Sequence, residues 1–521
     1  GHSMHLTSQP WAAAIRRKPF GRFFSVLVTA LAAASFHAEA QAPLDVRIAL
    51  VIGNSAYAAA PLVNPANDAR AMGETLRGLG FDVVELRDAQ KAQMAEAIAK
   101  VRTALQGKQG IGMLYYAGHG LQLDWQNYMV PVDAKMSKAA DVPEQAVNIN
   151  SVIDAFKGAG NRMNILVLDA CRDNPFAGTA SGKGLAQLDA PPGTFLAYAT
   201  APDNVAEDGD AKGGNGLYTQ YLLEELKKPV AKIEDVFKRV RFNVRQKSQG
   251  RQIPWESTSL EDDFFFNTGK VVAVAKLSEN DKENAFNAEK MDWDRIKDGR
   301  NTDDFFAFLK KYPSGFISEQ AQAVLERLQK AKVTTVAGKD GLEQLPSSAR
   351  FRLGDEWTTR VIDGYSNTEV RRGSTRVVKI TEDRVELSDG VTVLTPEGGT
   401  ISNRFIPDMS PPRLDLPAGE YVVGKKWEFR SIETRPNGAK GWVTGESRVT
   451  ALEVVTVPAG SFKAYKVELR SINQFGARAE LTRWMDPNFG VPLKMVRAIY
   501  PRSGPPDRDV FELVSLKRGP G

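Results

Sequence analysis

Between residues 47 and 266 the chain alternates short, almost continuously apolar runs with amphipathic segments of helical period. Such runs predict strands buried on both faces, and helices between them indicate a mainly parallel sheet covered on both sides. Sites in sheets of this kind lie at the carboxyl ends of the strands. The expected strands are residues 48–52, 81–86, 111–117, 165–170, 194–200 and one near 253–255. The expected helices are residues 65–79, 89–105, 149–157, 217–226 and 233–246.

Two of these apolar runs end in residues that can do chemistry. Cys171, the single cysteine of the chain, follows residues 164–170 (NILVLDA), and His119 follows residues 112–118 (GMLYYAG). A free thiol with a pKa of about 8.5 is mostly protonated at neutral pH, so it needs a neighbouring imidazole to become a nucleophile. The pair therefore predicts a cysteine hydrolase with Cys171 as nucleophile and His119 as proton carrier.

Other interpretations of these two residues are open at this stage. Cysteine is among the residue types most often buried in protein cores, and a single histidine is commonly structural. A zinc site would need two further ligands beside His119 and Cys171. The occurrence of both residues at strand ends favours catalysis over these alternatives.

Five short segments of this region resemble caspase-like peptidases of the bacterial metacaspase and paracaspase type. They are residues 49–54 (ALVIGN), 67–69 (NDA), 115–120 (YYAGHG), 169–176 (DACRDNPF) and 198–202 (YATAP). The resemblance implies an α/β caspase-like domain with a catalytic dyad of His119 and Cys171 and no third member. It also implies an oxyanion hole made by the backbone N–H groups of Gly120 and Cys171. Glycine at position 120 would let the backbone approach the substrate closely.

The resemblance further implies an acidic first substrate pocket. Its floor would be formed by Asp68, Asp169 and an acid of residues 205–209, with Asp208 as the expected residue and Glu207 as the alternative. Carboxylates grouped in a pocket select a long cation, which predicts cleavage after Arg, more weakly after Lys, and not after Asp. Alternatively, Asp68 braces a helix start and Asp169 stabilises a loop.

Two further features follow from the same resemblance. Lys183, flanked by glycines in the loop after the nucleophile, is a possible autocleavage site or simply part of a surface loop. No cofactor is expected. Calcium dependence is an alternative, because Asp133, Asp141 and Glu144 follow the histidine motif, but their spacing is not that of a calcium loop.

The N-terminus has the composition of a secretory leader. Residues 1–3 look like a tag scar, residues 16–22 are basic, residues 23–36 are apolar, and residues 38–40 (AEA) form a small-residue cleavage pattern. This predicts an exported, periplasmic or secreted protein; a retained anchor is the alternative. A lone cysteine in an oxidising compartment also favours a functional role for Cys171. The formal charge of +5 is small for 521 residues, and the sequence contains no basic stripe interleaved with aromatic residues. Nucleic-acid binding is therefore not expected.

The remaining chain changes character twice. Residues 277–330 show helical period on both sides of a turn at residues 312–315, which predicts a helical hairpin. From residue 349 the period is two, which predicts an antiparallel β-domain of unknown role whose tryptophans pack in a core rather than line a ligand groove. The expected division is leader 1–42, caspase-like domain 43–268, helical connector 275–332, linker 333–348 and β-domain 349–521.

The sequence as a whole thus predicts a cysteine endopeptidase whose partners are proteins or peptides with basic residues. The alternative is a catalytically silent caspase-like scaffold that binds an envelope partner through its helical and β sections. The natural substrate, a zymogen step and the oligomeric state do not follow from the sequence.

Overall fold

The computed structural model describes residues 45–171, 185–186, 188–200, 214–268, 277–333, 350–419 and 421–520, with backbone only for 171 and 330–333. The predicted leader and most of the predicted linker lie outside these ranges. Residues 45–521 group as one compact unit.

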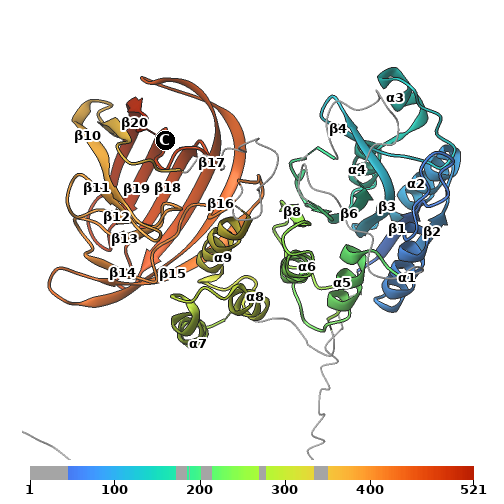
Figure 1. Ribbon diagram of the computed structural model, residues 1–521, viewed down its shortest axis with the longest axis horizontal. Coiled ribbons are helices and arrows are strands. Elements are labelled where there is room, and N and C mark those ends of the chain that lie inside the picture. Colours follow the sequence, from blue (N-terminus) through green and yellow to red (C-terminus); the bar gives the residue numbers. More distant parts are fainter. Residues whose placement is uncertain are drawn as a thin grey trace, which may run out of the picture. The chain divides into compact units, whose positions relative to one another are not determined.

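The N-terminal domain is built on one twisted sheet whose main strand order is β2-β1-β3-β6-β7-β8 (Figure 1). All neighbouring pairs on this path are parallel except β7 and β8, and the short strands β4 and β5 extend β3 as an antiparallel addition. The strands are β1 (Arg47–Gly53), β2 (Asp82–Arg87), β3 (Ile111–Leu123), β4 (Gln126–Met129), β5 (Val147–Asn148), β6 (Met163–Cys171), β7 (Thr194–Tyr198) and β8 (Trp255–Thr258).

Helices cover both faces of this sheet, as the buried apolar strands require. One buried cluster joins the sheet to α1, α5 and α6, and a second joins its other face to α2 and α4. The helices are α1 (Pro65–Gly78), α2 (Lys91–Leu105), α3 (Val142–Gln145), α4 (Ile149–Gly158), α5 (Leu217–Leu226) and α6 (Ile233–Lys247), with a 3-10 turn at Ala139–Asp141. The predicted α/β class is confirmed.

Strand β3 is longer than expected. The prediction ended it at residue 117, whereas the strand continues to Leu123 and changes partner on the way. Up to His119 it pairs with β6, and from Gly120 it pairs with β4. His119 therefore lies inside a strand and not at its end, because the β3–β4 hairpin prolongs the ladder beyond the last residue of β6.

Three helices follow: α7 (Glu279–Ile296), α8 (Thr302–Lys311) and α9 (Ser318–Val333). The last two are the predicted hairpin, and their apolar faces share one buried cluster with α7. At the turn, the buried carboxylate of Glu289 accepts the N–H groups of Phe316 and Ile317, each at 2.8 Å, and leaves no room for a side chain at Gly315. None of the helices in the described ranges has the length and apolar content needed to cross a membrane.

The C-terminal part, called the β-domain below, is one antiparallel sheet, as predicted (Figure 1). It bends strongly, and neighbouring strands are mostly consecutive in the chain except that β9 pairs with β20. Its strands are β9 (Glu356–Asp363), β10 (Glu369–Ile380), β11 (Val385–Leu387), β12 (Val393–Leu394), β13 (Thr400–Ser402), β14 (Asp408–Ser410), β15 (Lys426–Thr434), β16 (Lys440–Val457), β17 (Gly460–Asn473), β18 (Arg478–Met485), β19 (Lys494–Tyr500) and β20 (Asp507–Lys517).

The four tryptophans of the β-domain divide into two pairs. Trp357 and Trp427 are buried in apolar clusters, in line with the predicted core role. Trp442 and Trp484 are half-buried and lie beneath cations: Arg430 is 4.7 Å from the ring centre of Trp442, and two lysines flank Trp484. Partial exposure under a cation is an arrangement that stabilises the packing of both side chains.

Candidate active site

The backbones of His119 and Cys171 lie side by side. Parallel pairing of β3 and β6 places the two residues in register, as the last pair of that ladder. Neighbouring strands are about 4.8 Å apart, so the two Cα atoms are close enough for thiol and imidazole to interact. The side chain of Cys171 lies outside the part of the chain that the structure describes.

The imidazole of His119 is held by a backbone group that the sequence did not indicate. Its Nε2 is 2.7 Å from the carbonyl oxygen of Ala60, and the side chain is only 4% exposed. A carbonyl can only accept, so Nε2 carries the hydrogen in the neutral ring, and Nδ1 bears the lone pair. The carbonyl of Ala60 thus takes the orienting position that a carboxylate fills in a catalytic triad. A backbone group of this kind cannot be predicted from a side-chain motif.

A pair of tyrosines fixes the backbone around His119. The ring of Tyr57 lies 4.4 Å from the imidazole, centre to centre, and its hydroxyl accepts the N–H of His119 at 3.0 Å. The hydroxyl of Tyr116 donates to the carbonyl of His119 at 2.6 Å. Both hydroxyls crowd Gly118, where φ is +154° and a Cβ would lie 2.7 Å from each of them. Glycine is therefore required at position 118 for space and for backbone conformation.

Gly120 presents its N–H toward the end of β6. The N–H of Val130 donates to the carbonyl of His119 at 3.1 Å, so Gly120 and Met129 form a non-hydrogen-bonded pair of the β3–β4 ladder. N–H groups alternate sides along a strand, which directs that of Gly120 away from β4 and toward the side where β6 ends.

The structure gives a second reason for glycine at position 120, beside the predicted close approach of a substrate. A Cβ there would lie 2.8 Å from the Cβ of Ala170 and 2.9 Å from Cδ2 of Leu185. These protein atoms already occupy the space that a side chain would need. Because both neighbours are buried, a larger residue would displace one of them.

Asp68 and Asp169, predicted to share a pocket, converge on Gly216 from α1 and β6. A Cβ on Gly216 would lie 3.3 Å from Oδ2 of Asp68 and 3.7 Å from Oδ2 of Asp169. The other oxygen of Asp68 accepts the N–H of Gly216 at 3.0 Å, so this buried carboxylate also braces the start of α5. The bracing role of Asp68 is therefore observed, and its role in a substrate pocket stays a prediction.

Two buried hydroxyls, those of Thr219 and Tyr115, lie beside Asp169. Thr219 donates to Oδ2 of Asp169 at 2.8 Å, and its hydroxyl is 2.5 Å from that of Tyr115. Burial raises the pKa of Tyr115 well above its usual value, and the charges of Asp68 and Asp169 add to the increase. The sequence analysis did not select Thr219 or Tyr115; the signal was that Tyr115 precedes Ala117, the β3 partner of Asp169, by two residues on the same face.

The other predicted residues have different outcomes. Glu207, Asp208 and Lys183 lie outside the described residues. Asp133 accepts the N–H of Lys91, and Asp141 accepts N–H groups of the preceding turn, which lower its pKa. Within the described ranges, no three His, Cys, Asp or Glu side chains are grouped so that they could hold a metal ion.

Comparison with known proteins defines the class of this domain. Residues 46–265 match the family of peptidases described as the caspase domain. This part of the chain is therefore a caspase-like cysteine peptidase domain, and such peptidases are hydrolases. The resemblance inferred from the motifs is confirmed.

Two curated relatives match 183 residues, or 34% of the chain, at 30% identity. They are the mucosa-associated lymphoid tissue lymphoma translocation protein 1 of Homo sapiens and its homologue in Mus musculus. The match spans about a fifth of their length, 22% and 21%. Among solved structures, the Drosophila initiator caspase Dronc matches 43% of this chain and 83% of its own, with a TM-score of 0.32 and 14% identity.

Proposed function

We propose that the chain is a cysteine endopeptidase that cleaves after Arg, and more weakly after Lys, with Cys171 as nucleophile and His119 as general base and acid. The observation that carries this proposal is the register of the two residues at the end of the β3–β6 ladder within a caspase-like domain. Nδ1 of His119 takes the thiol proton, and the thiolate attacks the scissile carbonyl carbon. The same nitrogen then protonates the departing amine, and water hydrolyses the acyl-enzyme.

The oxyanion formed in this reaction needs donors that are already in place. The N–H of Gly120, directed toward the end of β6, supports the assignment of Gly120 and Cys171 as the oxyanion hole. A preorganised donor of this kind is worth about 3–4 kcal/mol in the transition state. The carbonyl of Ala60 would stabilise the imidazolium that forms during proton transfer.

Specificity for arginine is supported by the acidic pair at Gly216. The Oδ2 atoms of Asp68 and Asp169 are both within reach of one guanidinium, whose fork can bind two carboxylates at once. Asp208, with Glu207 as its alternative, completes the proposed pocket, because the chain comes back beside Asn67 and Asp68 at residues 214–216, a few positions after that segment. Lys would bind more weakly, since an ammonium cannot form the bidentate pair.

The decisive experiment compares fluorogenic peptides ending in Arg, Lys or Asp on the wild-type protein, Cys171→Ala and His119→Ala. We expect turnover in the order Arg, Lys, and none for Asp, and loss of about 10³-fold or more in both variants. Asp169→Asn should reduce the Arg rate far more than it reduces alkylation of Cys171 by iodoacetamide. Equal signal from all three proteins would instead support the scaffold alternative.

The proposal includes an exported protein that acts on basic protein or peptide substrates without a cofactor, with autocleavage at Lys183 as a possible step. An envelope partner for the β-domain remains part of the scaffold alternative. Intact mass after incubation tests the autocleavage: the same fragment in Cys171→Ala would rule it out. N-terminal sequencing of protein secreted by the native host would test cleavage after residue 40.

A further inference from the structure

Strand β8 is an edge of the caspase-like sheet, and a segment of the β-domain covers it. Residues 422–426, called the docking segment, lie against this edge: the hydroxyl of Ser257 donates to the carbonyl of Val423 at 2.5 Å. Lys426 donates to the carbonyl of Leu260 at 2.7 Å. Gly424, with φ of +91°, packs so closely on Thr258 that an added Cβ would overlap its backbone. An uncovered edge strand would expose its unpaired backbone groups.

The docking segment also contributes to the core of the caspase-like domain. Val422 is 6% exposed and belongs to the same buried cluster as Trp255 of β8, Tyr198 of β7 and Leu185. A β-domain side chain thus fills a place in the packing of the neighbouring domain. Removing it would open a cavity there, which makes the contact part of the fold and more than a surface touch.

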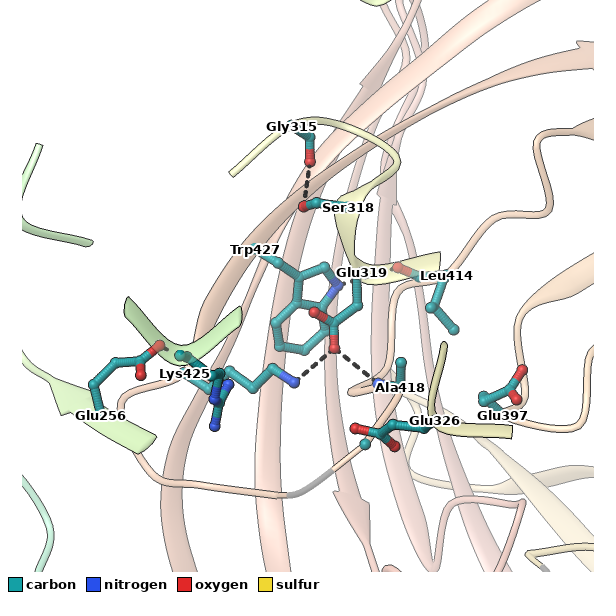
Figure 2. Close-up of polar contacts among 12 residues, drawn as sticks. Glu256, Gly315, Ser318, Glu319, Glu326, Glu397, Leu414, Ala418, Lys425 and Trp427 are labelled. Atoms are coloured by element: carbon teal, nitrogen blue, oxygen red, sulfur yellow. Dashed lines mark hydrogen bonds and ion pairs between the residues drawn. The ribbon is translucent and has the colours of Figure 1, made fainter. Parts of the chain in front are cut away.

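Helix α9 holds the docking segment from the other side (Figure 2). The buried carboxylate of Glu319 binds the ammonium of Lys425 at 2.6 Å and accepts the N–H of Ala418 at 2.9 Å. Burial alone would raise the pKa of Glu319, but Lys425 and these hydrogen bonds hold it below its usual value. The carboxylate is therefore ionised at neutral pH and fixes both ends of the turn that carries the docking segment.

Ser257 also binds the part of the chain that follows the nucleophile. Its hydroxyl donates to Val423 and accepts the N–H of Ala190 at 3.3 Å, which uses its donor and one acceptor site. The bridging segment consists of residues 185–186 and 188–190, which follow Cys171 in the chain. Its last residue, Ala190, is the one that Ser257 binds. Burial raises the pKa of Tyr465 on β17, and the charge of Asp189 in this segment adds to the increase, so the segment lies near the β-domain at Asp189.

The other end of the bridging segment reaches the proposed oxyanion hole. The side chain of Asn127 on β4 binds the backbone of Ala186 twice: it donates to the carbonyl at 2.8 Å and accepts the N–H at 2.6 Å. Asn127 is 1% exposed, so these two bonds are shielded from water. The adjacent Leu185 packs on Gly120, and its Cδ2 would be 2.9 Å from a Cβ added to that glycine.

We propose that the β-domain positions the oxyanion hole: docking on β8 holds the bridging segment, which sets the place of Gly120 through Leu185. The inference rests on the proposed function. Asn127 and Ser257 are accordingly positioning residues, which touch no substrate atom. The physical reason is that a donor misplaced by a fraction of an ångström stabilises an oxyanion poorly, while the thiol and imidazole keep their own geometry.

The test uses the full-length protein with two glycine variants matched in backbone strain. Gly424→Ala introduces a methyl that overlaps Thr258, whereas Gly438→Ala, at φ of +80° in the β15–β16 turn, points into open space. For Gly424→Ala we expect kcat on an Arg peptide to fall about tenfold with KM within about twofold. Alkylation of Cys171 by iodoacetamide should stay within about twofold of wild type, because it forms no oxyanion. Gly438→Ala should match the wild type in all three.

Hydrogen exchange gives a readout that needs no turnover. The amides of Ala186 and Ala190 should exchange faster in Gly424→Ala than in Gly438→Ala. A second pair, Lys426→Ala with Lys440→Ala as control, repeats the comparison if Gly424→Ala folds poorly. Unchanged kcat, unchanged exchange, or alkylation that falls in parallel with kcat would each overturn the proposal. If the wild type cleaves no amide substrate, the proposed function fails, and exchange still decides whether the β-domain holds the bridging segment.

Discussion

Asp68 and Asp169 come from different elements, 101 positions apart in the sequence, and aim their Oδ2 atoms at one glycine. The two oxygens are 3.3 and 3.7 Å from the point where Gly216 would carry a Cβ, so they are at most 7.0 Å apart, the sum of these distances. Gly216 is the N-cap of α5 and has φ of −57° and ψ of 153°, a conformation open to any residue. A side chain at position 216 would therefore fill space beside the two carboxylates without straining the backbone.

Gly216→Ala should therefore reduce cleavage after Arg without unfolding the protein. The methyl would contact both carboxylates and occupy room that a guanidinium needs, so kcat/KM for Arg peptides should fall about tenfold. The melting temperature should change little. Gly78→Ala, at the end of α1 with no atom near its Cβ position, is the control. Full activity of Gly216→Ala would show that the acidic pair does not receive the substrate side chain.

Tyr57→Phe should impair His119 through its backbone. The variant removes the hydroxyl that accepts from His119 and donates to Val130 at 2.9 Å, and leaves both buried groups without that partner. Such a loss costs about 1–3 kcal/mol in the free energy of unfolding, and activity should fall with it. Tyr365→Phe removes a solvent-exposed hydroxyl bond and should cost far less, as denaturant unfolding of both variants would reveal.

Glu289 predicts a pH dependence of stability that Glu289→Gln should diminish. Burial raises its pKa to about 7, although the N–H groups of Ile317 and Phe316 oppose the shift. The folded protein thus binds this proton more tightly than the unfolded chain, whose value is near 4.5. The resulting stabilisation, about 3 kcal/mol, is complete below pH 4.5 and is lost as the pH rises to about 7.

Melting temperatures at pH 5 and pH 7.5 provide the measurement. The difference between the two should be smaller in Glu289→Gln, whose amide does not titrate, than in the wild type. Glu283→Gln, on the same helix at an exposed position, is the matched control and should behave like the wild type. An identical pH difference in all three proteins would contradict the assignment.

Turnover should be unchanged by a metal chelator. The proposed chemistry uses only thiol, imidazole and backbone donors, and Asp133 and Asp141 already accept backbone N–H groups. Activity measured after dialysis against EDTA, then with calcium restored, is the test. Loss in EDTA with recovery in calcium would favour the calcium-dependent alternative.

Local patterns predicted the elements of the caspase-like domain well. The predicted helix at residues 217–226 coincides with α5, and the predicted strand at 48–52 differs from β1 by one residue at each end. Buried strands and amphipathic helices leave their period in the chain, so these elements are visible without coordinates. The extension of β3 beyond residue 117 could not be predicted in this way, because residues 120–123 become a strand only by pairing with β4.

The sequence by itself determined the chemical groups: one thiol, one imidazole outside the predicted leader, and the acids that accompany them in recognisable motifs. Only the tertiary structure decided that the carbonyl of Ala60 orients His119, that Leu185 packs on Gly120, and that the β-domain covers β8. A backbone carbonyl has the same chemistry at every position, and a contact between distant residues leaves no period in the chain. Such relationships exist only when folding has brought the segments together.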